Sequence, residues 1–378
     1  MSLRLRAALS ALRNTGTEIA RSTKRGFARA AAAGLYARPL DLARDRVVLL
    51  FFEDVERDTW VRGDRHLRRN ARRLARAVRK GQTVSGVEMA VRLLIEAVER
   101  LGYRVVLNDR GLAARNPGYP IGLAGYPHVL DGWDLPNPAI LGPGLLDHPL
   151  ERPRLMDDPR FRAYIVPSPW MEDLFERAWH GRTFRWFAGI DVAAWPDFSS
   201  ASKDLDFLIY EKFLWDKEGR RRDLLAPIEA ALKARGLRFA SIRYGNYVHA
   251  QYRALLRRSR GLLFLCDHET QGIACAEAMA CNVPVLAWDQ GFWLDPLRLR
   301  FGEEPVAASS VPYFGPSCGE KFEGAAAFPE ALNRFLKGLG QYEPRRFVAE
   351  NLSLELSGRR YLERYAALAS ESAAARTG

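Results

Sequence analysis

Short apolar runs alternate with amphipathic stretches along most of the chain. Val47–Phe52 (VVLLFF) is a continuous apolar run, typical of a strand that is buried on both faces of a parallel sheet. Residues 87–98 then place apolar side chains at helical spacing, and Arg104–Leu107 follows as a second short strand. A strand, a helix and a strand in this order predict a βαβ unit.

The composition of the chain changes within the first half. Residues 116–149 are dense in Gly and Pro, which predicts short strands joined by long, functional loops. A strand is expected at 164–166 and an amphipathic helix at 170–179. Around 195–203 the composition turns to Pro, Ser and Asp, and we place a domain boundary there.

The alternation of strands and helices returns after this boundary. Apolar runs predict strands at 206–210, 238–242, 261–266, 283–287 and 305–308, and helical spacing predicts helices at 221–235, 248–258, 273–281 and 328–339. Such an order indicates an α/β domain whose parallel sheet is covered on both faces. The last amphipathic helices, within 345–367, have no strand after them.

The length of the chain favours two domains. At roughly 150 residues per domain, 378 residues of which 48% are hydrophobic can form two buried cores. We predict a basic amphipathic extension, two α/β domains of which the first has a basic insert at 57–80, and terminal helices, with bounds 1–45, 46–196, 197–342 and 343–378. Arg interrupts the N-terminal segment too soon for a secretory signal, and no apolar run is long enough to span a membrane, so we expect a cytoplasmic protein.

The positive charge is concentrated at one end. Residues 1–80 contain 20 Lys and Arg against 8 Asp and Glu, which accounts for the whole net charge of +12. Such a segment can bind nucleic acid, an anionic membrane leaflet or an acidic substrate, and a solvated basic helix without a partner explains it as well. The four cysteines have no CxxC spacing and lie in or near apolar runs, so we expect buried thiols and neither a zinc site nor disulfides.

Candidate chemistry begins in the segment 261–286. The predicted strand runs into a turn that contains Glu269, Gly272 opens the next helix, and Glu277 lies about one turn inside it. Ligands of such folds bind at the carboxyl ends of strands, beside helix N-termini that favour anions. In a helix the two carboxylates would be roughly 12 Å apart, beyond the ~5–9.5 Å of glycosidase pairs. Two carboxylates that bind hydroxyls at opposite ends of one long ligand fit better, although a salt-bridged Glu277 and a plain turn residue at 269 remain the alternative.

Two lysines follow the strand at 206–210. Lys212 and Lys217 lie five residues apart on a predicted strand-to-helix loop. They can converge on a diphosphate and stabilise it as it leaves. Solvated surface lysines are the alternative.

These residues resemble a known family. Glu269, seven residues, and then Glu277-Ala-Met-Ala is similar to the E-x7-E segment of retaining glycosyltransferases of the GT-B fold, in particular family four. Lys212 and Lys217 resemble the family's Arg-x4-Lys pair. Further similarities, in the same order and over about residues 46–370, are Thr83-Val-Ser-Gly-Val87, the helix start Ser168-Pro-Trp-Met171 and Gly189-Ile-Asp191.

The resemblance implies two Rossmann-like domains that face across a cleft, with the final helices crossing back to the N-terminal one. The C-terminal domain would bind the nucleotide sugar and the N-terminal domain the acceptor. Glu269 would contact sugar hydroxyls, Glu277 the ribose, and Lys212 and Lys217 the diphosphate. Gly86 would let the N-terminal loop approach the phosphate, because glycine has no Cβ in the way.

Other roles follow from the same resemblance. Gly272, Ile273 and His268 would belong to the donor-binding residues. His128 lies roughly where the family can carry an acceptor-side histidine with a catalytic role, and a satisfied structural histidine is the alternative. The reaction would retain the anomeric configuration, without a metal, a cofactor or a protein nucleophile, and with a nucleoside diphosphate sugar as donor substrate.

The expected acceptor is a glycan or a lipid-linked glycan, with residues 1–80 holding the enzyme at the anionic inner face of a membrane. A small-molecule or sugar-phosphate acceptor is the alternative within the same fold. A nucleic-acid-binding protein that uses the basic arm is disfavoured, because the basic segments have few interleaved aromatics, although Trp60 is present, and no zinc-finger or RNA-recognition pattern occurs. The Glu pair and the lysines argue against an inactive protein of this fold.

The chain also departs from the family pattern. Thr270-Gln271 replaces the Gly-Phe that usually follows the first Glu, so the sugar pocket is expected to differ. Asn282 replaces a turn glycine, and Asn is the next best residue for a left-handed turn. Lys212 stands where Arg is usual, which loses a bidentate donor.

Overall fold

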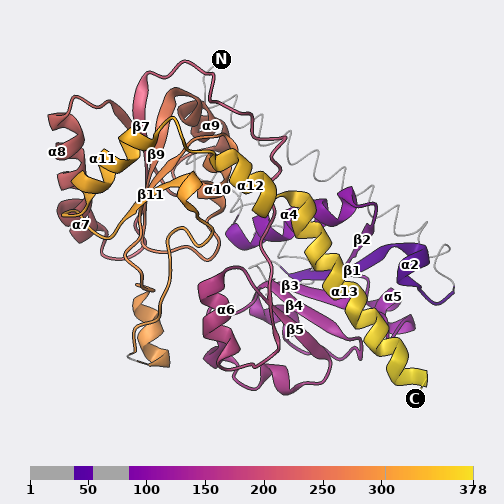
Figure 1. Cartoon of the computed structure of the whole chain (residues 1–378). Helices are drawn as coiled ribbons and strands as arrows, with labels where there is room; N and C mark the ends of the chain where they lie inside the picture. The colour runs from indigo at the N-terminus through magenta and orange to yellow at the C-terminus, as the bar shows by residue number, and fades with distance from the viewer. Residues whose placement is uncertain (1–37, 54–84, 303, 378) are drawn as a thin grey trace, which may run out of the picture.

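The computed structural model describes residues 38–53, 85–302 and 304–377, and it contains two parallel sheets (Figure 1). The first sheet has the order β2-β1-β3-β4-β5-β6, with β1 (Val47–Glu53), β2 (Arg104–Leu107), β3 (Ile121–Gly125), β4 (Ala139–Gly144), β5 (Phe161–Val166) and β6 (Thr183–Arg185). The second has the order β11-β10-β9-β7-β8, with β7 (Leu205–Lys212), β8 (Phe239–Arg243), β9 (Ser259–Cys266), β10 (Val285–Trp288) and β11 (Gly319–Phe322).

Helices connect these strands. The α-helices are α2 (Leu42–Asp45), α4 (Gly86–Arg100), α5 (Arg110–Arg115), α6 (Pro169–Glu176), α7 (Lys217–Arg220), α8 (Ala226–Ala234), α9 (His249–Arg258), α10 (Ile273–Ala280), α11 (Phe328–Gly338), α12 (Pro344–Asn351) and α13 (Leu354–Thr377). A π-helical turn, η4 (Arg221–Leu225), precedes α8. Short 3-10 helices are η1 (Pro127–Leu130), η2 (Pro149–Glu151), η3 (Leu155–Asp157), η5 (Pro296–Phe301) and η6 (Pro316–Cys318).

The predicted α/β architecture is confirmed. All pairings between the named strands are parallel, and the apolar run at the start of β1 is buried between two neighbouring strands, as its composition predicts. One core cluster forms around the first sheet, and two clusters, one for each face, form around the second. The four cysteines are buried free thiols, as expected.

The strand predicted at 305–308 is wrong. Residue 307 forms only an isolated antiparallel bridge with Phe292, and the outer strand of the second sheet is β11, parallel to β10. The sequence of β11 is Gly-Glu-Lys-Phe, and only its first and last residues are buried. An edge strand with charged residues at its centre has too little apolar signal to be recognised from the pattern alone.

The C-terminal helices cross back to the first domain, as predicted. Figure 1 shows α12 and α13 running from the second sheet to the face of the first. Tyr361 and Tyr365 of α13 are buried in the core of the first sheet. The Tyr365 hydroxyl accepts a hydrogen bond from the Leu49 amide at 2.9 Å and donates one to the carbonyl of Pro120. The last helix is therefore part of the N-terminal domain's core.

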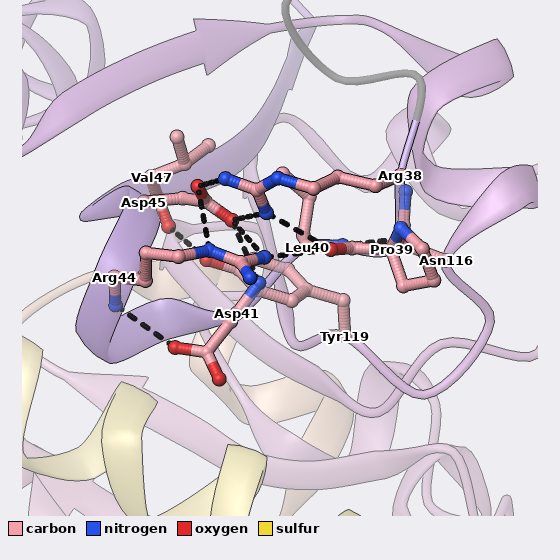
Figure 2. A network of polar contacts seen from close by, with 9 residues as sticks. All are labelled: Arg38, Pro39, Leu40, Asp41, Arg44, Asp45, Val47, Asn116 and Tyr119. Carbon is pink, nitrogen blue, oxygen red and sulfur yellow. Dashed lines mark hydrogen bonds and ion pairs between the residues drawn. The ribbon is translucent and has the colours of Figure 1, made fainter.

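The start of the described chain is held by polar contacts within residues 38–45 and by one contact to Asn116, which ends α5 (Figure 2). The Arg38 guanidinium and the Asp41 amide both donate to the Asp45 carboxylate, at 2.6 and 2.8 Å. Burial alone would raise the pKa of Asp45, but these two donors outweigh it and lower the pKa. The Leu40 amide donates to Asn116 Oδ1 at 2.7 Å. Residues 38–45 are thus attached to the N-terminal domain through Asn116.

Two predicted segments lie outside the described residues: the basic extension, of which only 38–45 is described, and the basic insert at 57–80. The domain boundary at 196/197 stays a prediction. Within the described part of the chain, no helix is long and apolar enough to cross a membrane.

Candidate functional site

A cleft of about 370 Å³ lies between the two sheets. Its N-terminal wall comes from the first residues of α4 and from the loops after β3, β4 and β5. Its C-terminal wall comes from the end of β7, the loop after β8 and the turn that leads into α10. On both sides the lining follows the carboxyl ends of parallel strands, which is where ligands bind in such folds. Six predicted site residues line it: Gly86, Lys212, Glu269, Gly272, Ile273 and Glu277.

Lys212 and Glu269 form an ion pair in the cleft. Lys212 Nζ lies 2.7 Å from Glu269 Oε1, and the two side chains are only 14% and 11% exposed. The ammonium also lies 4.6 Å from the centre of the Tyr244 ring. Burial alone would lower the pKa of Lys212, but the Glu269 carboxylate outweighs it and raises the pKa. The wall therefore carries a permanent cation whose present partner is a carboxylate.

Glu277 is a buried carboxyl group on the same wall. It belongs to α10, lines the cleft and is 6% exposed. Burial raises the pKa of Glu277 to about 8, although the charge of Arg253 acts in the opposite direction. Near neutral pH this group is mostly protonated and can both donate and accept hydrogen bonds.

The turn before α10 has the backbone shape that its glycine predicts. Gly272 caps the helix with φ of 82° in the left-handed region, and Ile273 is the first helical residue. The free N–H groups of such a helix start favour an anion. On the other wall Gly86 is the first residue of α4, and a Cβ at this position would meet no atom within 4 Å. A ligand can therefore approach the backbone there.

Three predicted site residues do not line the cleft. Lys217 is exposed at the start of α7. His128 lies in η1 with Nε2 3.6 Å from Glu53 Oε2, although its neighbours Tyr126 and Pro127 do line the cleft. The roles given to these residues stay predictions.

His268 is the third of them, and it is buried among aromatic side chains. Its ring stacks on Trp215 with centroids 5.2 Å apart and meets Trp170 and Trp293 edge-on. Burial, followed by the charge of Lys212, lowers the pKa of His268 to about 4. The imidazole is therefore neutral and serves as a packing group in this arrangement.

Several cleft residues were not identified from the sequence. Tyr210, Tyr244 and Tyr247 stand beside Lys212 and Glu277, and the hydroxyls of Tyr210 and Tyr247 lie 2.9 Å apart. The pattern Tyr244-Gly-Asn-Tyr247 after β8 is the signal that could have indicated them.

The wall opposite is mostly apolar. Its charged side chains, within the described part of the chain, are Asp147 and Glu151. Among the described residues no three His, Cys, Asp or Glu side chains gather as a metal site would require.

Comparison with known proteins identifies the fold. No protein-family model matches the sequence, and no curated protein matches it. The structure is similar to AviGT4, a glycosyltransferase involved in avilamycin A biosynthesis, at 16% identity and a TM-score of 0.51, over 86% of this chain and 98% of that one. Sucrose-phosphate synthase from Thermosynechococcus elongatus aligns at 14% identity and a TM-score of 0.47, over 85% and 99%. The chain has the GT-B fold, with two Rossmann-like domains that face across a cleft.

Proposed function

We propose that this protein is a retaining glycosyltransferase that transfers a sugar from a nucleoside diphosphate sugar to a glycan or lipid-linked glycan. The observation that carries the proposal is the grouping of Lys212, Glu269, Glu277 and the start of α10 on one wall of the cleft. A buried cation and a helix N-terminus suit a diphosphate, and the two carboxyl groups suit the hydroxyls on either side of it.

Donor binding would exchange the partners of the ion pair. The diphosphate would take Lys212 from Glu269, since a phosphate group carries more charge and more acceptor oxygens than a carboxylate. The released Glu269 would accept hydrogen bonds from the sugar, and Glu277 would hold the ribose. The charge on the leaving diphosphate grows in the transition state, so Lys212, the start of α10 and, as the resemblance implies, Lys217 would lower the barrier.

Retention is proposed with attack on the face from which the diphosphate leaves, without a protein nucleophile and without a metal. The N-terminal wall would present the acceptor, and His128 is the histidine that the resemblance places on that side. The apolar lining and the carboxylates Asp147 and Glu151 favour an uncharged acceptor sugar over a phosphorylated one, because like charges repel. The small-molecule acceptor remains the second candidate on the same observation.

The charge of residues 1–80 supports a further part of the proposal, a peripheral location at the anionic inner face of a membrane. A lipid-linked acceptor would then be met at the surface where it resides. A basic segment also attracts nucleic acid, but nothing in the described cleft favours that function.

A transfer assay tests the proposal. Wild-type protein is incubated with UDP-, GDP-, ADP- and TDP-sugars and acceptor glycans in EDTA, and released nucleoside diphosphate is measured. One donor is expected to support release, and NMR of the product is expected to show the donor's anomeric configuration. Glu269→Gln is the matched variant and is expected to be inactive. Release that requires a divalent metal, or inversion in the product, would contradict the metal-independent retaining reaction.

A further inference from the structure

The turn that carries Glu269 is held by the other domain. Trp170 of α6 donates its indole N–H to the main-chain oxygen of Glu269 at 2.9 Å. Gln271 pairs with the main chain of Ala188, since its Nε2 donates to the Ala188 carbonyl at 2.7 Å and its Oε1 accepts from the Ala188 amide at 2.8 Å. Trp170 and Ala188 both belong to the core of the first sheet. Three hydrogen bonds thus link the N-terminal domain to two residues of the C-terminal wall, Glu269 and Gln271.

The main chain of Glu269 is fixed on both sides. Its amide donates to the carbonyl of Ser309 at 2.9 Å, while its carbonyl accepts from Trp170. The Trp170 ring also meets His268 edge-on, with centroids 5.9 Å apart. Because Lys212 would move to the diphosphate when a donor binds, these main-chain contacts would then set the position of Glu269.

Gln271 stands at one of the positions where the chain departs from the glycosyltransferase pattern. A phenylalanine there has neither a donor nor an acceptor, whereas the glutamine amide supplies both. The glutamine therefore makes a directed link between the two domains that a phenylalanine at this position lacks.

We propose that Trp170 and Gln271 are positioning residues, through which the N-terminal domain fixes the turn that presents Glu269 to the donor sugar. The inference rests on the proposed function, because it assumes that Glu269 contacts the reacting sugar. In this arrangement the N-terminal domain, which would bind the acceptor, sets the position of a residue that contacts the donor sugar. A displacement of about 1 Å at such a contact can cost about 10²-fold in rate.

Two variants remove the link, one at each of the residues that form it. Trp170→Phe deletes the indole N–H, and Gln271→Met keeps the length of the side chain but neither hydrogen bond. Trp179→Phe is the matched control, since Trp179 Nε1 donates to the Pro153 carbonyl at 3.1 Å entirely within the N-terminal domain. Both tryptophans are buried, at 8% and 4% exposure. Melting temperature, kcat, donor KM and the Kd of the nucleoside diphosphate are measured for each protein.

Trp170→Phe and Gln271→Met are each expected to lower kcat about tenfold or more, with the Kd of the nucleoside diphosphate within about twofold of wild type. The nucleotide contacts proposed for Lys212 and Glu277 lie in β7 and inside α10, outside residues 269–271, which is why binding and turnover should separate. The melting temperature of Trp179→Phe is expected to fall by about as much as that of Trp170→Phe, while its kcat stays within about twofold of wild type. A merely structural role would not produce this split between turnover and nucleotide binding.

Equal kcat in Trp179→Phe and the two link variants would overturn the inference while leaving the proposed function intact. Wild-type protein that binds no nucleoside diphosphate would overturn both the inference and the proposed function. That result is obtained from the wild type alone. Should Trp170→Phe fail to fold, Gln271→Met decides by the same criteria.

Discussion

The buried carboxyl group of Glu277 should make the stability of the protein depend on pH, and Glu277→Gln isolates this effect. Burial raises the pKa of the folded protein's Glu277 to about 8 from an ordinary value of 4.5. Glutamine keeps the shape of the side chain and cannot titrate. The variant therefore removes the proton equilibrium with little change of packing.

The number of protons bound by the folded and the unfolded chain determines whether stability rises or falls with pH. Between about pH 5 and pH 8 the unfolded chain has lost the proton that folded Glu277 keeps, so the folded state binds more protons. The free energy of unfolding then falls as pH rises, by up to about 1.4 kcal/mol per pH unit. From pH 6 to pH 8 the contribution of Glu277 declines by about 2 kcal/mol, because the slope flattens near the folded pKa.

Guanidinium unfolding at pH 6, 7 and 8 measures this contribution. The control is Glu330→Gln, a glutamate of α11 whose side chain is 82% exposed. Wild type and the control are expected to lose about 2 kcal/mol more than Glu277→Gln over this range. Parallel curves for wild type and Glu277→Gln would refute the reasoning, because they would mean that the carboxyl group titrates alike in the folded and unfolded chain.

Three other predictions concern the donor site and the basic segment. Lys212→Ala and Lys217→Ala are each expected to lower kcat by about 10²-fold or more, because Lys212 lines the cleft and the resemblance places Lys217 at the same leaving diphosphate; wild-type turnover in Lys217→Ala would remove that residue from the site. Glu269→Ala is expected to abolish transfer with the fold intact, whereas Glu277→Ala mainly raises the donor KM; steady-state kinetics that match wild type in both would contradict these roles. Full-length protein is expected to sediment with anionic liposomes and to be released by roughly molar salt, whereas a chain that begins near Arg44, which keeps only the basic insert at 57–80, is expected to sediment less; equal sedimentation of the two proteins would refute membrane binding through the basic N-terminal extension.

The fold was predictable where a strand is buried on both faces. The runs that form β1, β9 and β10 contain only apolar residues over most of their length, and each was predicted within two residues of its ends. The same reasoning missed β11, because this strand has too few apolar residues. It also predicted a strand at 305–308, where four uncharged residues form none. The pattern of apolar residues indicates which strands are buried, so it does not identify a half-exposed edge strand.

The C-terminal wall of the cleft was predictable in the order of its residues. Glu269, Gly272 and Glu277 follow one another along a strand, a turn and a helix, so local order along the chain determines their place. The contacts of Trp170 and Gln271 cross between domains, and they depend on how the two domains meet. No local pattern contains that information, and for this reason the sequence indicated Gln271 only as a departure from the family.

The left-handed turn after α10 shows a successful prediction from residue chemistry. Asn282 has φ of 60°, the region in which asparagine is the best substitute for glycine. The left-handed turn is therefore kept, and β10 begins at Val285, two residues after the start predicted for this strand.

Direct titration with nucleotides tests the central claim, that the wall formed by Lys212, Glu269 and Glu277 binds a nucleoside diphosphate. Calorimetry and thermal shift are run with UDP, GDP, ADP, TDP and CMP on wild type and on Glu277→Ala. One diphosphate is expected to bind wild type and, at 100 times its Kd, to add about 2.7 kcal/mol of stability, and Glu277→Ala is expected to bind it more weakly. The absence of binding and of any thermal shift with all five nucleotides would contradict the account.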